Sequence, residues 1–402
     1  MQQFNFPTTL LYGEGSLEEG LKRIKELKYK KILLVTDKTL TKIGLAKRVE
    51  DHIKELEMHV HTFDDVSPNP VEDDCIHGAK VFKENNCDAI IALGGGSPMD
   101  AAKGIMVLST HEGPLSKYDD AMGGDRFITK KLPDLFAIPT TAGTGSEVGR
   151  SGVIIVNDTK NKTIIFHPTM LPKMAILEPT LTTKLPAAIT AATGLDAFTH
   201  ALEAYLAPTF HPMADGIALE AIKLVLENLM TAFKDPENIK ARERMLLAAS
   251  MGATAFQKGL GMIHSIAHPL SSECGLHHGL ANALVLPKCI ELIENSSLSQ
   301  AQKERLETIQ NIFHKLEQRT LVAAYKFYCD KDLINAHSAE ADTTATYEVL
   351  LSQLEKYEEL ENDVNFLADF SQRGGKFADM AGFVRFNDKG EKVLSFGKYR
   401  GV

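Results

Sequence analysis

The first half of the chain alternates short apolar runs with longer amphipathic segments. Runs with the length and composition of buried strands lie at 31–36, 58–63, 88–93 and 135–139. Helical periodicity follows three of them, at 39–56, at 71–86 and from Pro98 onward. Further apolar runs at 153–156, 163–166 and 174–177 complete a β-rich region. This alternation predicts a parallel sheet with helices on both faces, so we expect an α/β domain over 1–180.

The pattern changes near residue 181. Helical periodicity dominates from there, at 186–206, 214–233, 238–256, 259–271 and 281–294. We therefore expect an all-α domain over 181–312. The remaining segment, 313–402, combines helical patterns at 317–329 and 343–357 with a predicted β-hairpin, 382–386 and 392–396, around a Gly-bearing turn.

Composition narrows the functional class only slightly. The 402 residues have room for two or three domains, and a net charge of -9 argues against a general nucleic-acid binder. The five cysteines are odd in number and lack CxxC spacing, which is typical of reduced thiols in a cytoplasmic protein. We see no signal-peptide pattern at the N-terminus and no apolar stretch long enough to span a membrane.

The helical region contains a set of candidate metal ligands. Asp196 and His200 are four residues apart in GLDAFTHALEAY, so a helix would place both on one face. His264 and His278 follow in GMIHSIAHPLSSECGLHHGLAN. One carboxylate with several imidazoles suits a divalent metal such as iron or zinc. The alternative is that some are ordinary core histidines, since the chain has 14.

Two more histidines leave the assignment open. His268 lies four residues after His264, on the same predicted helix face, and could be a ligand or a proton relay. His277 competes with His278 for the role of ligand.

The α/β region contains candidate phosphate-binding loops. Gly94, Gly95, Gly96 and Ser97 follow a buried strand and open a helix, where free N–H groups and the helix dipole suit a pyrophosphate. The run is not the GxGxxG fingerprint, and a tight strand–helix turn is the alternative. A second loop, 139–147, offers hydroxyl groups to phosphate or ribose, or its hydroxyls simply cap the loop itself. Asp37 ends the first predicted strand, where it could accept bonds from a ribose or cap the next helix.

At these residues the sequence resembles the iron-containing (group III) alcohol dehydrogenase family. The matching motifs are GGGSPMDAAK, PTTAGTGSEV, GLDAFTHALEAY and GLGMIHSIAHPLSSECGLHHGLANALVLP, which occur in family order within about 4–312. The resemblance implies the architecture shared with dehydroquinate synthase: a Rossmann-like α/β domain, then a helical domain, with the active site between them. It also implies a homodimer or larger assembly.

The resemblance assigns roles to individual residues. It implies that Asp196, His200, His264 and His278 bind Fe²⁺, or Zn²⁺ as in some relatives, and that His268 is catalytic or relays a proton. It further implies an NAD(P) site, and relatives with aspartate at the position of Asp37 usually prefer NAD. The residues that the resemblance places along this cofactor are Asp37, Asn69, Gly95, Gly96, Ser97, Thr140, Thr141, Thr144 and Lys162.

The expected reaction is hydride transfer between a nicotinamide and a small alcohol or aldehyde. Arg150 stands where relatives often have Thr or a small residue, and Lys258 lies one to two turns before His264. One or both could bind a substrate carboxylate. That would favour an ω-hydroxy acid such as 4-hydroxybutyrate. A solvated or cofactor-facing cation is the alternative for both.

The segment from about 310 departs from the family and resembles the end of a DEDDh-type 3′–5′ exonuclease. His337 and Asp342, in HSAEAD, match the last motif of that family. The earlier paired carboxylates of such an exonuclease do not occur in this sequence, so we expect no nuclease activity. The chain then looks like a fusion, and an impaired dehydrogenase or a lyase of the same fold are the competing interpretations.

Overall fold

The computed structural model describes residues 8–316 and the short stretches 329, 331, 344–345, 347–349, 351–352, 384–386 and 392–394. The chain forms two compact units, Met1–Ile309 and Gln310–Val402. In the second unit, β9 (Val384–Phe386) and β10 (Lys392–Leu394) pair antiparallel, which confirms the predicted hairpin. Most of the predicted helices at 317–329 and 343–357, together with His337 and Asp342, lie outside the described residues.

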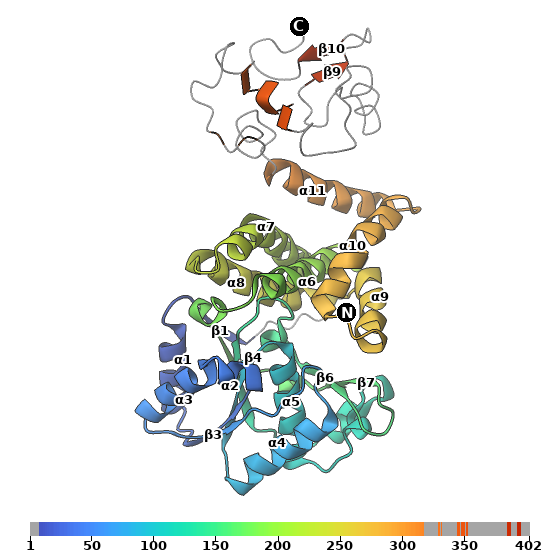
Figure 1. Cartoon of the computed structure of the whole chain (residues 1–402). Helices are drawn as coiled ribbons and strands as arrows, with labels where there is room; N and C mark the ends of the chain where they lie inside the picture. Colours follow the sequence, from blue (N-terminus) through green and yellow to red (C-terminus); the bar gives the residue numbers. More distant parts are fainter. Residues whose placement is uncertain are drawn as a thin grey trace. The chain divides into compact units, whose positions relative to one another are not determined.

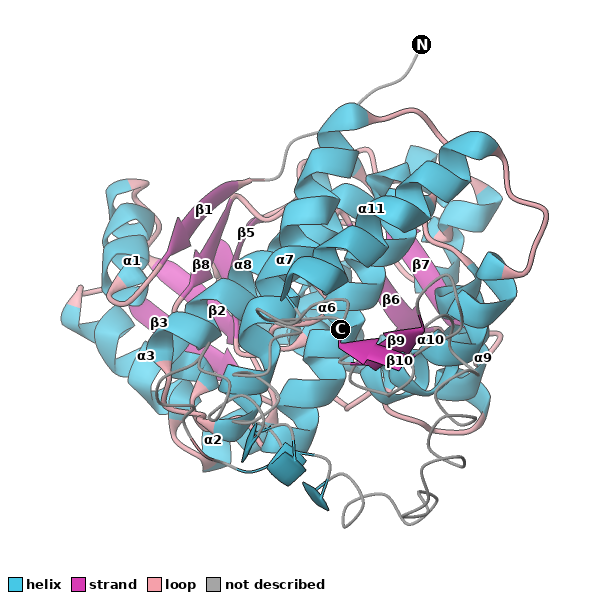
Figure 2. Cartoon of the chain, turned by 90° about the horizontal axis from the view of Figure 1, so that it is seen from above, coloured by secondary structure: helices cyan, strands magenta, loops and turns pink. Residues whose placement is uncertain are grey.

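The first unit is built on a six-stranded parallel sheet in the order β1-β8-β5-β4-β2-β3. The strands β1, β8, β2 and β3 of this sheet are labelled in Figure 2. Its strands are β1 (Thr9–Tyr12), β2 (Lys31–Val35), β3 (His59–Phe63), β4 (Ala89–Gly94), β5 (Asp134–Pro139) and β8 (Met174–Leu177). All neighbouring pairs run parallel. The chain leaves β2 for β3 on one side, whereas β4 returns to the other side of β2. In such sheets ligands bind beyond the carboxyl ends of the strands at this reversal, here between β2 and β4.

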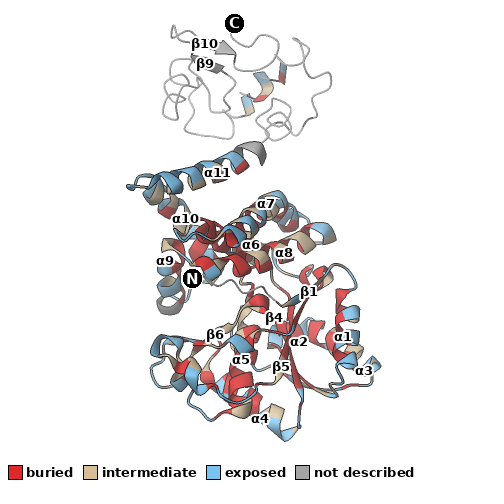
Figure 3. Cartoon of the chain, turned by 180° about the vertical axis from the view of Figure 1, so that it is seen from behind, coloured by how far each residue is buried: buried red, intermediate tan, exposed pale blue. Residues whose placement is uncertain are grey.

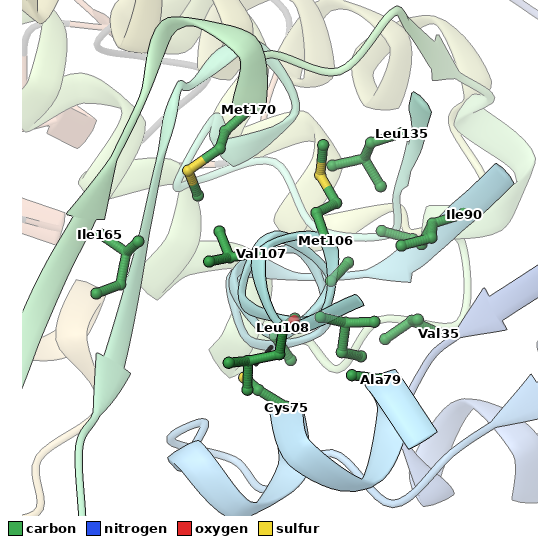
Figure 4. Close-up of a cluster of buried hydrophobic side chains, with 14 of the residues drawn as sticks. Val35, Cys75, Ala79, Ile90, Met106, Val107, Leu108, Leu135, Ile165 and Met170 are labelled. Atoms are coloured by element: carbon green, nitrogen blue, oxygen red, sulfur yellow. Dashed lines mark hydrogen bonds between the residues drawn. The ribbon is translucent and has the colours of Figure 1, made fainter. Parts of the chain in front are cut away.

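Helices cover both faces of the sheet, as predicted. They are α1 (Ser16–Glu26), α2 (Lys38–Lys42), α3 (Leu45–Glu55), α4 (Glu72–Glu84) and α5 (Gly96–Thr110). Side chains alternate between faces along each strand: Leu33 and Val35 of β2 join one apolar cluster with α4 and α5, and Ile32 and Leu34 join another with α1 and α3. Figure 4 shows the first cluster around α5, whose Met106, Val107 and Leu108 are buried.

The structure corrects several predicted elements. The single helix expected at 39–56 is two helices, because Gly44 adopts φ +84° and stands at the start of α3. The runs at 153–156 and 163–166 do not join the sheet but form a separate antiparallel pair, β6 (Ser151–Ile155) and β7 (Lys162–Phe166). The elements β1 and α1 were not predicted at all.

The helical part of the first unit follows β8 (Figure 1). Its helices are α6 (Ala187–Leu206), α7 (Pro212–Lys234), α8 (Ile239–Ala255), α9 (Met262–Glu273) and α10 (His278–Glu294), and α11 (Gln300–Leu316) comes next. We call residues 8–180 the α/β lobe and residues 181–309 the helical lobe. Both belong to the one compact unit, and each has a buried interior (Figure 3).

Short 3-10 helices connect these elements. They are η1 (Leu115–Tyr118), η2 (Asp120–Met122), η3 (Gly124–Phe127), η4 (Ser146–Val148), η5 (Pro168–Met170), η6 (Pro179–Thr182) and η7 (Phe256–Lys258). Among the described residues, none of the helices has both the length and the apolar character needed to cross a membrane.

Candidate metal and cofactor site

The predicted metal ligands converge inside the helical lobe. α6 carries Asp196 and His200 on one face, and both are buried. One ligand atom each from Asp196, His200 and His264 lie within 4.8 Å of one another. His264 Nε2 and His278 Nε2 both lie 3.6 Å from Asp196 Oδ1. Bonds of about 2.1 Å to a tetrahedral metal would put its ligand atoms about 3.4 Å apart, close to these separations.

An amide group marks the point at which the ligands converge. Asn282 is buried on α10, and its Nδ2 lies 2.7 Å from Asp196 Oδ1, 3.2 Å from His264 Nε2 and 3.4 Å from His278 Nε2. Asp196 Oδ1 and the two ring nitrogens therefore lie around one point in the helical lobe. Asn282 Oδ1 is buried without a hydrogen-bond partner. The donor set and its geometry fit a divalent metal ion.

The candidate ligands differ in their protonation, and two of the histidines are neutral near pH 7. Burial lowers the pKa of both His200 and His278 to about 4, so their ring nitrogens are neutral and free to bind a metal near pH 7. Burial alone would raise the pKa of Asp196, but His200, His264 and His278 lower it well below its usual range. Although burial opposes it, the carboxylates of Asp196 and Glu203 raise the pKa of His264 to about 9.

Glu203 orients His264 and was not predicted from the sequence. Its Oε2 lies 2.6 Å from His264 Nδ1, and its Oε1 accepts a bond from Ile263 N at 2.6 Å. The pairing holds the Nδ1 proton on the far side of the ring, so Nε2 faces Asp196. A carboxylate behind a histidine ligand is a common device for fixing tautomer and ring orientation. The sequence could have indicated Glu203, because it lies three residues after His200 and therefore on the same side of the predicted helix.

The other histidines separate into distinct positions. His278 is the first residue of α10 and points Nε2 to Asp196, whereas His277 precedes the helix and is exposed. His268 lies one helical turn beyond His264 on α9, with its ring centroid 5.0 Å from that of His278. Partial burial and then the charge of His264 lower the pKa of His268, which leaves it neutral and able to accept a proton.

The predicted cofactor loops meet at the carboxyl edge of the sheet. β4 and β5 are neighbours with Gly94 opposite Pro139, so the loops that follow them start side by side. A Cβ on Gly95 would come within 3.1 Å of Thr141 Oγ1, and one on Gly96 within 3.0 Å of Thr144 Cγ2. A Cβ at either position would therefore push the two loops slightly apart. The backbone at the start of α5 is left accessible to a phosphate.

The remaining predicted cofactor residues lie around this edge, although several have local partners. Asp37 follows β2 and caps α2, since its Oδ1 accepts a bond from Leu40 N at 3.0 Å. Ser97 Oγ donates to Pro68 O at 2.6 Å, which holds the loop carrying the exposed Asn69. Thr140 is buried after β5, and Lys162 opens β7. Asp37 thus caps a helix, which was the alternative to its ribose-binding role. The cap uses only Oδ1, so Oδ2 can make a further contact.

The two candidate substrate residues differ in their surroundings. Arg150 is partly exposed, stacks over the Phe166 ring at 5.4 Å and donates from Nη2 to Gln257 Oε1 at 3.4 Å. The neighbour of Gln257, Phe256, has its ring 5.1 Å from that of His200. Arg150 is therefore linked to His200 indirectly, through Gln257 and its neighbour Phe256.

Lys258, in contrast, is committed to a structural network. Its buried Nζ donates to Asp215 Oδ1 at 2.6 Å and to Tyr205 O at 3.1 Å, and Arg305 binds the other oxygen of Asp215 at 2.7 Å. These bonds join α7, α11 and the end of α6. The structure contradicts the expectation that Lys258 binds substrate, because its charge is already paired within the helical lobe.

Comparison with known proteins defines the class. The family model "Iron-containing alcohol dehydrogenase" matches residues 7–179, and "Fe-containing alcohol dehydrogenase family, C-terminal" matches residues 190–361. The chain therefore belongs to the iron-containing alcohol dehydrogenase family and is an oxidoreductase of that class. The second match extends beyond residue 312, so it covers part of the segment that resembles an exonuclease.

Individual relatives agree with this assignment. The chain is 46% identical to a 4-hydroxybutyrate dehydrogenase of Cupriavidus necator over 261 residues, which are 63% of this chain and 67% of that protein. Among solved structures, a 1,3-propanediol oxidoreductase superposes with TM-score 0.70 at 33% identity, over 87% of this chain and all of that one. A sulfoacetaldehyde reductase from Bifidobacterium kashiwanohense in complex with NAD⁺ superposes with TM-score 0.68 at 26% identity, over 87% and 99%.

Proposed function

We propose that this alcohol dehydrogenase transfers hydride between NAD(H) and the terminal carbon of a primary alcohol or ω-hydroxy acid, with a divalent metal at the site. The observation that carries the proposal is the cluster formed by the ligand atoms of Asp196, His200, His264 and His278. The ion would be Fe²⁺, with Zn²⁺ as the alternative. Either would act there as a Lewis acid toward the alcohol oxygen.

The residues of the chain supply the other requirements of the reaction. Asp196 adds a negative charge to neutral His200 and His278, and Glu203 keeps the His264 ring in place. His268 is neutral and lies beside His278, which suits a group that accepts the alcohol proton. The backbone of Gly95 and Gly96 would bind the pyrophosphate, with Thr141 and Thr144 next to it.

NAD rather than NADP is the proposed cofactor. Asp37 lies at the carboxyl end of β2, beside the reversal in strand order where the adenosine half of a dinucleotide binds. Its carboxylate suits ribose hydroxyl groups and would repel a 2′-phosphate. The named NAD⁺ complex of the sulfoacetaldehyde reductase supports the same choice.

A substrate carboxylate is the finer part of the proposal. Arg150 is partly exposed beside Gln257, whose neighbour Phe256 has its ring 5.1 Å from that of His200. A guanidinium binds a carboxylate through paired hydrogen bonds. The name of the Cupriavidus necator relative, a 4-hydroxybutyrate dehydrogenase, favours the same substrate class. We therefore propose 4-hydroxybutyrate and succinate semialdehyde as a substrate pair.

The test is NADH consumption by protein loaded anaerobically with Fe²⁺, with butanal and succinate semialdehyde as paired substrates. We expect turnover of both, loss of turnover with a chelator, and a preference for the charged aldehyde. Arg150→Ala should reduce that preference about tenfold or more, since a charged hydrogen bond is worth about 1.5–3 kcal/mol. Arg126→Ala is the matched control, because Arg126 also stacks on a phenylalanine, Phe127, at 4.8 Å.

The possible outcomes separate the parts of the proposal. An unchanged preference in Arg150→Ala would remove the carboxylate role and leave the dehydrogenase. Metal-loaded protein that binds NADH but reduces neither aldehyde would favour another substrate or a lyase of the same fold. Protein that retains no metal would favour the impaired fusion.

We also propose a cytoplasmic homodimer or larger assembly, and no nuclease activity from the C-terminal segment. The odd number of cysteines and their lack of CxxC spacing support the location. Size-exclusion chromatography with light scattering tests the assembly, and incubation with labelled single-stranded DNA and Mg²⁺ tests the nuclease prediction.

A further inference from the structure

A buried lysine lies beneath the cofactor loops. Lys103 is on α5, the helix that begins at the glycine loop, and it is fully buried. A lysine side chain is rarely buried to this extent, because removing its charge from water is costly unless the charge is paired and hydrogen-bonded. Its position and contacts therefore call for an explanation beyond packing.

The hydrogen bonds of Lys103 all go to one short segment. Its Nζ donates to Ser146 O at 2.8 Å, to Ser146 Oγ at 2.7 Å and to Ser151 O at 2.8 Å. An ammonium group has three donor hydrogens, and three acceptors take them here. Because the acceptors belong to residues 146 and 151, the side chain holds both ends of the segment between them.

Asp100 completes the network one turn earlier on α5. Ser146 Oγ accepts from Lys103 and donates to Asp100 Oδ1 at 2.8 Å, and Val153 N donates to Asp100 Oδ2 at 3.2 Å. Asp100 thus balances the charge of Lys103 and also binds β6. Close packing supports the contact, since a Cβ on Gly152 would come within 3.0 Å of Asp100 O.

The segment held by Lys103 also connects the two lobes. Glu147 is buried and accepts a bond of 2.6 Å from Ser250 Oγ on α8. A Cβ on Gly145 would lie 2.1 Å from Ala253 Cβ, so this loop packs directly on α8. On its other side, Thr144 Oγ1 accepts a bond from Ser146 N at 3.3 Å, and Arg150 follows within the segment.

We propose that Lys103 is a positioning residue that sets the cofactor loop and Arg150 relative to α5. By fixing residues 146–151, it would keep Thr141 and Thr144 over Gly95 and Gly96 and keep Arg150 beside Gln257. Lys103 itself touches neither the cofactor nor the substrate, because all its donors are used within the protein. The inference rests on the proposed NAD site, although part of its test does not.

The test compares Lys103→Met and Ser146→Ala with wild type. Methionine keeps the length of the side chain and removes its charge and donors, and alanine at 146 removes one acceptor and the link to Asp100. Lys80→Met on α4 is the matched control, because Lys80 is 69% exposed and makes only a 3.8 Å contact with Glu84. The measurements are amide hydrogen exchange of residues 140–151, NADH affinity by fluorescence, and metal content. The KM for NADH and kcat, with butanal as the aldehyde, and the melting temperature are measured as well.

We expect Lys103→Met to speed exchange in residues 140–151 at least tenfold and to weaken NADH binding about tenfold, with metal content unchanged. Ser146→Ala should show the same pattern with about a threefold effect, and Lys80→Met should show none. In Lys103→Met, the KM for NADH should rise by a larger factor than kcat falls. A purely structural role would instead lower the melting temperature and leave the KM for NADH and kcat at their wild-type values.

Several outcomes would overturn the proposal. A folded Lys103→Met with wild-type exchange in residues 140–151 and wild-type NADH affinity would do so. If Lys103→Met does not fold, Ser146→Ala decides, and unchanged exchange there would refute the role. If wild type does not bind NADH, the proposed cofactor fails, and the exchange measurement still decides whether Lys103 holds the loop.

Discussion

The cluster of candidate metal ligands in the helical lobe and the candidate cofactor edge of the α/β lobe are built from different parts of the chain. In the cluster, side chains such as Asp196, His200 and His264 point directly at one another from helices. At the cofactor edge, two of the expected side chains bind backbone groups of other residues: Asp37 accepts from Leu40 N, and Ser97 donates to Pro68 O. The groups left to bind a cofactor there are mainly backbone groups at Gly95 and Gly96, which carry no side chain. A site made of side chains can thus be found by residue type, whereas a site made of backbone depends on how loops meet.

The largest effect should come from removing the cluster's carboxylate. Asp196→Asn keeps the size of the side chain but removes the charge that faces three histidines. We expect metal to be lost on dialysis and kcat/KM to fall about 10³-fold or more, because a Lewis acid contributes several kcal/mol of transition-state stabilisation. Metal content by mass spectrometry and NADH titration are the measurements. If Asp196→Asn lost NADH affinity by the same factor as metal affinity, the two regions would not be independent of each other.

A smaller effect should follow from changing the residue behind a ligand. Glu203→Gln leaves the shape intact but weakens the 2.6 Å contact that orients His264. We expect metal affinity to fall about 10–100-fold, the usual cost of losing such a partner. Chelator competition measures it, with Glu220→Gln on α7, whose side chain is 54% exposed, as the control. Wild-type affinity in Glu203→Gln would mean that helix packing alone positions His264.

The cofactor edge should respond to added atoms instead of removed charge. Gly96→Ala places a Cβ 3.0 Å from Thr144 Cγ2, so the two loops must separate slightly. We expect NADH affinity to fall about fivefold, by roughly 1 kcal/mol, the lower end of what overpacking costs, while metal content stays unchanged. Gly216→Ala on α7 meets nothing within 4 Å and should stabilise its helix by about 0.5–1 kcal/mol. Isothermal titration and thermal melts are the measurements, and a loss of metal in Gly96→Ala would contradict the separation of the two regions.

The smallest effect concerns the cap at Asp37. Asp37→Asn keeps an oxygen for Leu40 N, so stability should change by less than about 0.5 kcal/mol, whereas Asp37→Ala should cost about 1 kcal/mol. Both should raise the ratio of NADPH to NADH turnover, because the negative charge near the proposed ribose position is lost. A ratio that stays constant in Asp37→Asn would reduce Asp37 to a helix cap.

Prediction from sequence succeeded where the signal was local. The i, i+4 spacing of Asp196 and His200 sufficed to place both on one face of α6, since helix geometry alone determines it. It failed where distant contacts decide: the runs at 153–156 and 163–166 have the same character as sheet strands, yet they pair with each other. Lys258 looked available for a substrate and is paired with Asp215, a residue 43 positions away.

The sequence by itself determined most of the elements, the family motifs and the shared helix face of Asp196 and His200, because these depend on residue type and on spacing within single elements. Only the tertiary structure decided which groups surround those ligands and loops. Each of these groups lies on a different element from its partner: Glu203 from His264, Asn282 from Asp196, and Lys103 from Ser146. The physical reason is that hydrogen bonds and charge pairing act over a few ångströms, and only packing brings distant parts of a chain that close.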